Sequence, residues 1–165
     1  MALFTLKGNP QNTNGDLPAV GSRAPIFKLV KNDLSELDSA ELRGKKIVLN
    51  IFPSLDTPTC AASVRRFNQE ASSLENTMVV CVSRDLPFAQ ARFCGSEGLD
   101  NVVTASDFRG SFAPDYGVEI QGGPLGNLTA RAVVVVDETG TVTHSDLVGE
   151  LAEEPDYEAV LVALG

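Results

Sequence analysis

Three apolar segments dominate the hydrophobic pattern of this chain. Residues 46–52 and 77–83 are almost continuously apolar and rich in β-branched residues, as is typical of central strands covered on both faces. Residues 131–137 form a third run, and after a turn at 138–140 the alternating residues 141–144 complete the pattern of a β-hairpin. We therefore predict a sheet with the three apolar segments at its centre.

Helical patterns follow the first two strands and close the chain. Apolar residues at spacings of three and four predict a helix over residues 58–74. A second helix is predicted over residues 87–93, ending at Cys94 and Gly95, because glycine is favoured at helix C-termini. Residues 155–164 are predicted to form the last helix.

The other predicted elements are short. Turn residues within residues 1–22 predict a small β-hairpin ahead of the main fold. The pattern then predicts a strand at 24–30, a helical turn at 38–42, a strand at 101–105, and a loop region at 106–129 with one helical turn near 109–112. This order of elements predicts an α/β protein with a thioredoxin-like fold, in which a mixed central β-sheet is flanked by helices and preceded by an extra N-terminal β-hairpin. No internal repeat or linker is evident, so residues 1–165 are predicted to be a single domain.

The charge balance narrows the possible partners. The 165 residues include 13 basic and 22 acidic side chains, a net charge of -9, which repels nucleic acid backbones and anionic lipid surfaces. We expect neither nucleic acid nor a membrane as a partner, since no apolar run is long enough to cross a bilayer. The first residues lack the pattern of a secretory signal, so we expect a cytoplasmic location.

Cys60 is the strongest candidate for chemistry. It lies at the start of the helix that follows the first apolar strand, with Thr57 as the N-cap residue and Pro58 at the first helical position. Cys60 then falls at the third position, where free backbone N–H groups and the helix dipole favour a thiolate. The local sequence therefore predicts a nucleophilic cysteine.

The rest of the sequence leaves few reactions open to this thiolate. A dithiol motif is absent, because the third residue after Cys60 is Ser63. The single histidine, His144, lies in a hairpin strand and is a poor candidate for a general base. Cys81 lies within an apolar run and is expected to be buried, and the scattered cysteines show no metal-ligand spacing. Peroxide reduction, in which hydroxyls, backbone dipoles and an arginine hold the thiolate, fits these residues.

Three motifs make the expectation more specific. Residues 53–60 read Pro-Ser-Leu-Asp-Thr-Pro-Thr-Cys, residues 85–94 run from Asp-Leu-Pro to Arg-Phe-Cys, and residues 126–131 read Gly-Asn-Leu-Thr-Ala-Arg. All three resemble the thiol peroxidase subfamily of the peroxiredoxins, which are atypical 2-Cys peroxiredoxins of bacterial type. The resemblance spans essentially the whole chain and implies a thiol-dependent peroxidase.

This resemblance implies a role for each residue around the thiol. Cys60 would be the peroxidatic residue, whose thiolate attacks one oxygen of the peroxide without a histidine base. Thr57 would hydrogen-bond the thiolate and the peroxide, and Pro53 would shield the pocket from water. Arg131 would fix the thiolate and the peroxide oxygens, which suits a reaction that builds negative charge between hydrogen-bond donors.

The resemblance also implies a complete redox cycle. Cys94 would be the resolving residue, forming an intramolecular disulfide with the Cys60 sulfenic acid after local unwinding near both residues. Thioredoxin would then reduce the disulfide, with no metal, haem or flavin. Hydrogen peroxide and alkyl or lipid hydroperoxides are the implied substrates. A homodimer is implied too, and Phe112 and Tyr116 are candidates for its contact.

Two other functions remain compatible with the residues. One is a redox-sensing thioredoxin-like interaction domain, whose Cys60 signals without turnover. The other is a noncatalytic thioredoxin-like binding module, in which Cys60 reacts slowly at neutral pH. Sustained peroxide-dependent turnover with thioredoxin would separate the enzyme from both.

Overall fold

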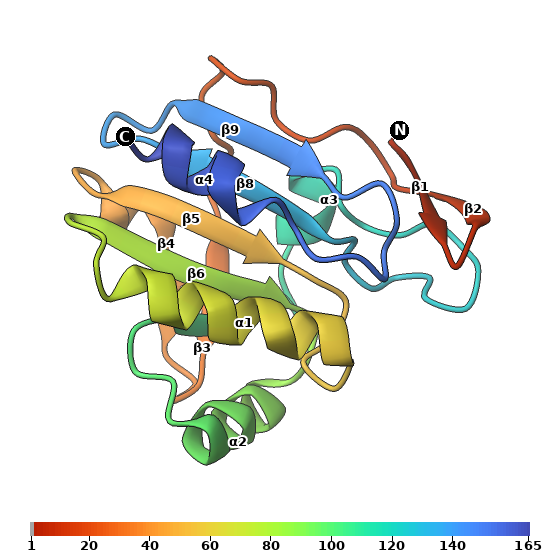
Figure 1. Cartoon of the computed structure of the whole chain (residues 1–165), viewed down its shortest axis with the longest axis horizontal. Coiled ribbons are helices and arrows are strands. Elements are labelled where there is room, and N and C mark those ends of the chain that lie inside the picture. Colours follow the sequence, from red (N-terminus) through yellow and green to blue (C-terminus); the bar gives the residue numbers. More distant parts are fainter. Residues whose placement is uncertain (1) are drawn as a thin grey trace.

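A mixed sheet lies at the centre of the protein (Figure 1), whose computed structural model describes residues 2–165. Within these residues the sheet has seven strands, which are β3 (Lys28–Lys31), β4 (Glu36–Asp38), β5 (Lys46–Ile51), β6 (Thr77–Ser83), β7 (Val103–Ser106), β8 (Ala132–Val136) and β9 (Val142–Leu147). They are arranged in the order β4-β3-β7-β6-β5-β8-β9. Strands β5, β6 and β7 are parallel to one another, and the other neighbours are antiparallel. The three apolar runs of the sequence are β5, β6 and β8, and they occupy the centre of the sheet as predicted.

Helices cover both faces of this sheet. On one face lie α1 (Pro58–Ala71), α2 (Pro87–Glu97) and α4 (Tyr157–Ala163), which share a hydrophobic cluster with alternate residues of β5, β6 and β8. The opposite face is covered by the 3-10 helix η1 (Ser39–Leu42) and the short α3 (Phe112–Asp115), which lies behind the sheet in Figure 1. This is the thioredoxin-like arrangement that the element order predicts. No helix within residues 2–165 is both long enough and apolar enough to traverse a bilayer.

The predicted N-terminal hairpin is present. β1 (Leu3–Leu6) and β2 (Asn9–Asn12) pair antiparallel as a separate small sheet. Thr5 N donates to Gly149 O and Leu151 N donates to Thr5 O, both at 2.8 Å. The hairpin is therefore bound to the segment that follows β9.

The second helix is longer than predicted. The sequence predicts an end at Gly95, but α2 continues to Glu97 and ends at Gly98, whose φ of 65° is the left-handed conformation of a helix C-cap. The Cys94 carbonyl accepts from the N–H groups of Gly98 and Leu99, and these bonds place the cap at the later of the two glycines. Cys94 therefore lies within the last turns of the helix.

The first strand of the sheet is also displaced from its predicted position. The sequence predicts a strand at 24–30, whereas β3 begins at Lys28, since Pro25 has no N–H to contribute to a strand ladder. The following strand β4, which pairs with β3, was not predicted. A turn with Leu34 at a φ of 70° joins the two strands, and a leucine gives no sequence signal for such a turn.

Phe112 and Tyr116 are wrong as candidates for a dimer contact. They are 1% and 0% exposed. Their rings stack with centroids 4.3 Å apart, and both meet the edge of Phe27. The Tyr116 hydroxyl donates to Pro25 O at 2.7 Å, so its polar end is also bound inside the chain. These residues belong to the core between α3 and the sheet.

Candidate active site

Cys60 lies in the first turn of α1, at the edge to which the arrows of the parallel strands β5 and β6 point in Figure 1. Pro58 is the first residue of the helix, and Thr57 before it has the extended backbone of an N-cap residue. Cys60 is therefore the third helical residue, as predicted, and its side chain is fully buried. Its sulfur lies beside a helix end with unpaired N–H groups and a positive dipole.

Arg131 is the charged partner of Cys60. Its Nη2 donates to Cys60 Sγ at 3.2 Å and its Nε donates to Leu151 O at 2.8 Å. Only 3% of the residue is exposed, and the third nitrogen, Nη1, is buried without a hydrogen-bond partner among the described residues. Donation by a guanidinium favours a thiolate over a thiol. The structure thus brings together the two residues that the sequence motifs single out 71 positions apart.

The segment after β9 fixes this arginine, and sequence reasoning missed it. Besides Leu151 O for Arg131, it supplies Ala152 O, which accepts from Thr59 Oγ1 at 3.0 Å. Glu150 holds the segment in place, because its carboxylate accepts from Ala152 N and from residues of the N-terminal hairpin. These hydrogen bonds lower the pKa of Glu150 to about 2, and the bond from Ala152 N has the largest effect. Backbone carbonyls and a loop glutamate form no motif, so no sequence signal marks them.

Glu150→Gln is expected to slow alkylation of Cys60 about three- to tenfold at neutral pH, because an amide nitrogen cannot accept from the backbone donors that the carboxylate holds. The displaced segment would then hold Arg131 less firmly. The measurement is the rate of Cys60 alkylation as a function of pH. Glu153→Gln is the matched control, since Glu153 is an exposed acid of the same segment. Equal rates in both variants would show that Glu150 does not support the site.

Thr57 and Pro53 flank the thiol in different ways. Thr57 is exposed, and its hydroxyl donates to Ser54 O at 2.9 Å, so it makes no side-chain cap to α1. The single hydroxyl proton of Thr57 is thereby used, so the expected hydrogen bond from Thr57 to the Cys60 thiolate is wrong for this structure, and the oxygen is left to accept. Pro53 is buried two residues after the end of β5. It carries no N–H that would need a partner at this position.

Cys94 packs against the hydrophobic cluster that contains Cys60, but its polar contact is with a different strand. It is half-buried, and its Sγ is 3.4 Å from the hydroxyl of Thr104 in β7. Arg131, the partner of Cys60, directly precedes β8, and the sheet order puts β8 three positions from β7. Three strand spacings correspond to about 14 Å, so Arg131 and Thr104, which contact the two sulfurs, lie at well-separated strands, and both cysteines are free thiols. The structure does not bring the two cysteines together.

Cys81 and His144 have the surroundings of structural residues. Burial raises the pKa of the Cys81 thiol to about 12, and a hydrogen bond from Asn50 only partly opposes this. Cys81 is therefore a buried thiol, as predicted. His144 is half-buried on the edge strand β9, and no hydrogen bond in residues 2–165 joins it to Cys60. No group of three metal-ligating side chains occurs in the described part of the chain.

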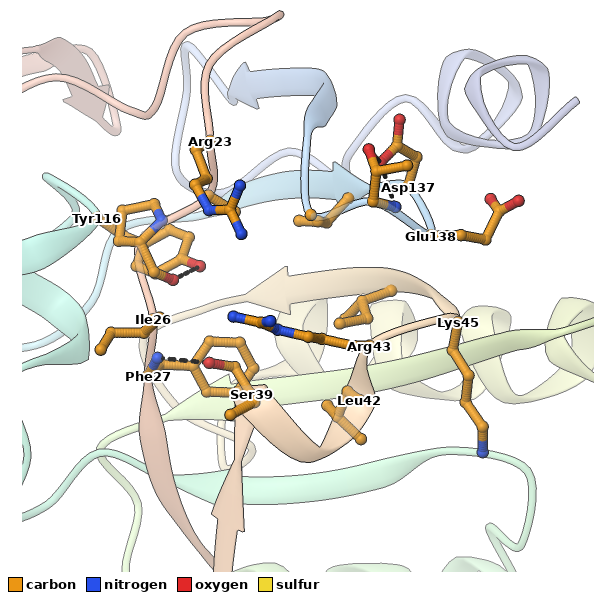
Figure 2. Close-up of a pocket in the computed structure, with 17 residues that line it drawn as sticks. Arg23, Ile26, Phe27, Ser39, Leu42, Arg43, Lys45, Tyr116, Asp137 and Glu138 are labelled. Carbon is orange, nitrogen blue, oxygen red and sulfur yellow. Dashed lines mark hydrogen bonds between the residues drawn. The ribbon is translucent and has the colours of Figure 1, made fainter.

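A small pocket of about 70 Å³ lies at the other end of β5 (Figure 2). Figure 2 shows the cations Arg23 and Arg43 in its walls together with the aromatic side chains of Phe27 and Tyr116. It is lined by residues near the start of β5, whereas Cys60 follows the end of this strand. No cysteine lines the pocket, so it is separate from the thiol chemistry.

Comparison with known proteins identifies the family. The Redoxin family model matches residues 19–161. The chain is 57% identical to the thiol peroxidase of Mycobacterium tuberculosis over 165 residues, which is 100% of this chain and 99% of the relative. It is 52% identical to the thiol peroxidase of Corynebacterium glutamicum, covering 99% of both chains.

Solved structures agree with these relatives. A peroxiredoxin-like protein from Aquifex aeolicus superposes with a TM-score of 0.95 at 41% identity, covering 99% of this chain and 96% of the other. The thiol peroxidase from Chromobacterium violaceum, at 23% identity, shares the fold with a TM-score of 0.88 over 98% of this chain and 94% of its own. The predicted fold and family are both confirmed. The chain belongs to the Redoxin family, as a member of the thiol peroxidase branch of the peroxiredoxins.

Proposed function

We propose that this peroxidase reduces hydrogen peroxide and alkyl or lipid hydroperoxides at Cys60. One observation carries the proposal. Arg131 donates to Cys60 Sγ through Nη2, while its buried Nη1 has no partner among the described residues. A buried guanidinium N–H without an acceptor is costly, and a peroxide oxygen placed next to the sulfur would supply that acceptor.

The reaction at Cys60 is a displacement at oxygen. The thiolate attacks one peroxide oxygen, an S–O bond forms and the O–O bond breaks. The sulfur is oxidised to a sulfenic acid, and the peroxide is reduced to an alkoxide or hydroxide that leaves with a proton as the alcohol or water. Arg131 and the first-turn N–H groups of α1 stabilise the negative charge that moves from sulfur to the leaving oxygen.

Thr57 and Pro53 would position the peroxide. Since the Thr57 proton is donated to Ser54 O, its oxygen can accept from the O–H of the peroxide and hold that same oxygen toward Cys60, so that the alkoxide or hydroxide is the leaving group. Pro53 is buried and has no N–H, so it adds apolar surface that excludes water from the reacting atoms.

Cys94 would resolve the sulfenic acid. Its sulfur attacks the Cys60 sulfur, an S–S bond forms, and the hydroxyl leaves as water with the Cys94 proton. Both sulfurs must leave their present sites. The structure of α2 supports this, because Pro87 and Gln90 are its only fully buried residues and Gly95 lies inside it. Shallow burial and an interior glycine are features of a segment that unfolds locally.

Thioredoxin would complete the cycle by reducing the Cys60–Cys94 disulfide. We place this cycle in the cytoplasm, where a disulfide reductant is available. We also propose that the enzyme is a homodimer, which sedimentation of the reduced protein would test. A monomer at micromolar concentration would contradict the dimer without affecting the chemistry at Cys60.

Two measurements test the proposed cycle. Peroxide, thioredoxin and its reductase should together give sustained consumption of NADPH, whereas a single stoichiometric burst would support a redox sensor. Nonreducing peptide mapping after one equivalent of peroxide should show a Cys60–Cys94 link within one chain. A link between two chains would assign the resolving step to a different kind of peroxiredoxin.

A further inference from the structure

The turn before α1 is bound to a carboxylate from another part of the chain. Asp85 lies between the end of β6 and the start of α2, and Ser54 Oγ donates to its Oδ1 at 2.7 Å. Its Oδ2 accepts from Leu55 N at 2.8 Å and from Ser83 Oγ at 2.7 Å. Two of these three donors belong to the peroxidatic loop, here defined as residues 53–57 between β5 and α1.

These bonds reach the helix that carries Cys60. The carbonyl of Ser54 accepts from both Thr57 N and Thr57 Oγ1, and Thr57 O accepts from Ala61 N in the first turn of α1. Leu55, the other residue held by Asp85, is 3% exposed and packs in the cluster that contains Cys60. The folded form of the peroxidatic loop therefore depends on the Asp85 carboxylate.

The same residue is also bound to the base of α2. Ser83 Oγ, which donates to Asp85, accepts from Gln90 Nε2 of α2 at 3.2 Å. The backbone oxygen of Asp85 accepts from Ser106 Oγ at the end of β7. Asp85 is thus anchored on the side of α2 and β7, where Cys94 lies, while its carboxylate holds the loop on the side of Cys60.

We propose that Asp85 is a positioning residue that keeps the peroxidatic loop folded while Cys60 reacts with peroxide, and whose release of this loop sets how fast Cys60 reaches Cys94. This inference rests on the proposed disulfide cycle. Each sulfenic acid either forms the disulfide or meets a second peroxide and becomes a sulfinic acid. Asp85 therefore sets the partition between resolution and overoxidation.

Asp85→Asn tests the proposal, because the amide keeps the shape but loses the negative charge, so the hydrogen bonds that its one oxygen accepts from Leu55 N and Ser83 Oγ become weaker. If the form with an unfolded peroxidatic loop is rare, a tenfold rise in its population barely lowers the population of the form with a folded loop. We therefore expect disulfide formation to be about tenfold faster and the peroxide step to stay within about twofold. The peroxide concentration that converts half of Cys60 to sulfinic acid should rise about tenfold, since resolution competes with overoxidation. Rapid acid quench followed by thiol labelling gives the disulfide rate, and mass spectrometry gives the sulfinic acid fraction.

Two control variants separate positioning from general loss of stability. Arg92→Gln removes the ion pair between Arg92 of α2 and Asp56 of the peroxidatic loop. Both side chains are 71% exposed, so this change should alter the disulfide rate less than about twofold. Val160→Ala weakens the core at α4 but removes no hydrogen bond of the loop, and should leave the disulfide rate unchanged. If Val160→Ala accelerated disulfide formation as much as Asp85→Asn does, the proposal would be overturned.

Hydrogen exchange of the reduced protein tests Asp85 independently of the redox cycle. Amides of residues 54–61 should exchange about tenfold faster in Asp85→Asn than in the wild type, because the loop opens more often. Unchanged exchange would overturn the role of Asp85 even if the disulfide forms. Absence of the Cys60–Cys94 link in the wild type would instead overturn the proposed cycle, and the exchange rates would still decide whether Asp85 holds the loop.

Discussion

Cys60→Ser is expected to lower peroxide turnover at least about a thousandfold, whereas Cys81→Ser should retain it within about twofold. A serine hydroxyl is not ionised near neutral pH, so neither Arg131 nor the helix dipole can turn it into an anion that attacks oxygen. Cys81 is fully buried in β6 with its thiol pKa raised to about 12. It therefore remains a neutral thiol and supplies no nucleophile.

The Cys81 variant is expected to fold because its surroundings already contain a polar partner. Asn50 Nδ2 donates to Cys81 Sγ at 3.7 Å, and Asn50 Oδ1 is buried without a partner among the described residues. A hydroxyl at position 81 can accept from Asn50 Nδ2 and donate to Asn50 Oδ1. The measurement is NADPH consumption with thioredoxin and peroxide, alongside the thermal midpoint of each variant. Equal loss of turnover in both variants, with intact folding, would contradict the assignment of Cys60.

The sequence predicts the parts of the fold that depend on local patterns. β5, β6 and β8 are recognisable because they are buried on both faces and so lack polar residues almost throughout. The end of α2 was less predictable, since Gly95 and Gly98 are both suitable caps and only the hydrogen bonds to Cys94 O distinguish them. The burial of Phe112 and Tyr116 depends on contacts with Phe27, about 90 residues away in the chain.

The residues of the candidate site are likewise of two kinds, those that local sequence predicts and those that it does not. Cys60 and Thr57 are recognisable from the start of a helix, and Arg131 from its motif, because local sequence defines each of them. Glu150 and Asp85 act through backbone N–H groups and hydroxyls of segments distant in sequence. Such contacts produce no periodic pattern and no characteristic residue spacing in the sequence. The residues that hold the site in place therefore became visible only with the fold.

Arg131→Met is expected to slow the reaction of Cys60 with peroxide about a hundred- to a thousandfold, the usual effect of removing a donor from a site that stabilises an oxyanion. The methionine fills a similar volume but offers neither the Nη2 bond to Cys60 Sγ nor the free Nη1 for the peroxide. Alkylation of Cys60 at neutral pH should slow as well, because the methionine removes the hydrogen bond to its sulfur.

Arg131→Lys separates the charge of the arginine from its geometry. A lysine keeps the positive charge, but its single nitrogen cannot reach Leu151 O and Cys60 Sγ in the fixed fork that the guanidinium provides. We expect a peroxide step about tenfold slower than wild type and a largely retained alkylation profile. Stopped-flow kinetics on the reduced enzymes measures the first quantity and iodoacetamide alkylation the second. A lysine variant as slow as the methionine variant would mean that geometry alone matters, and unchanged kinetics in both would remove Arg131 from the mechanism.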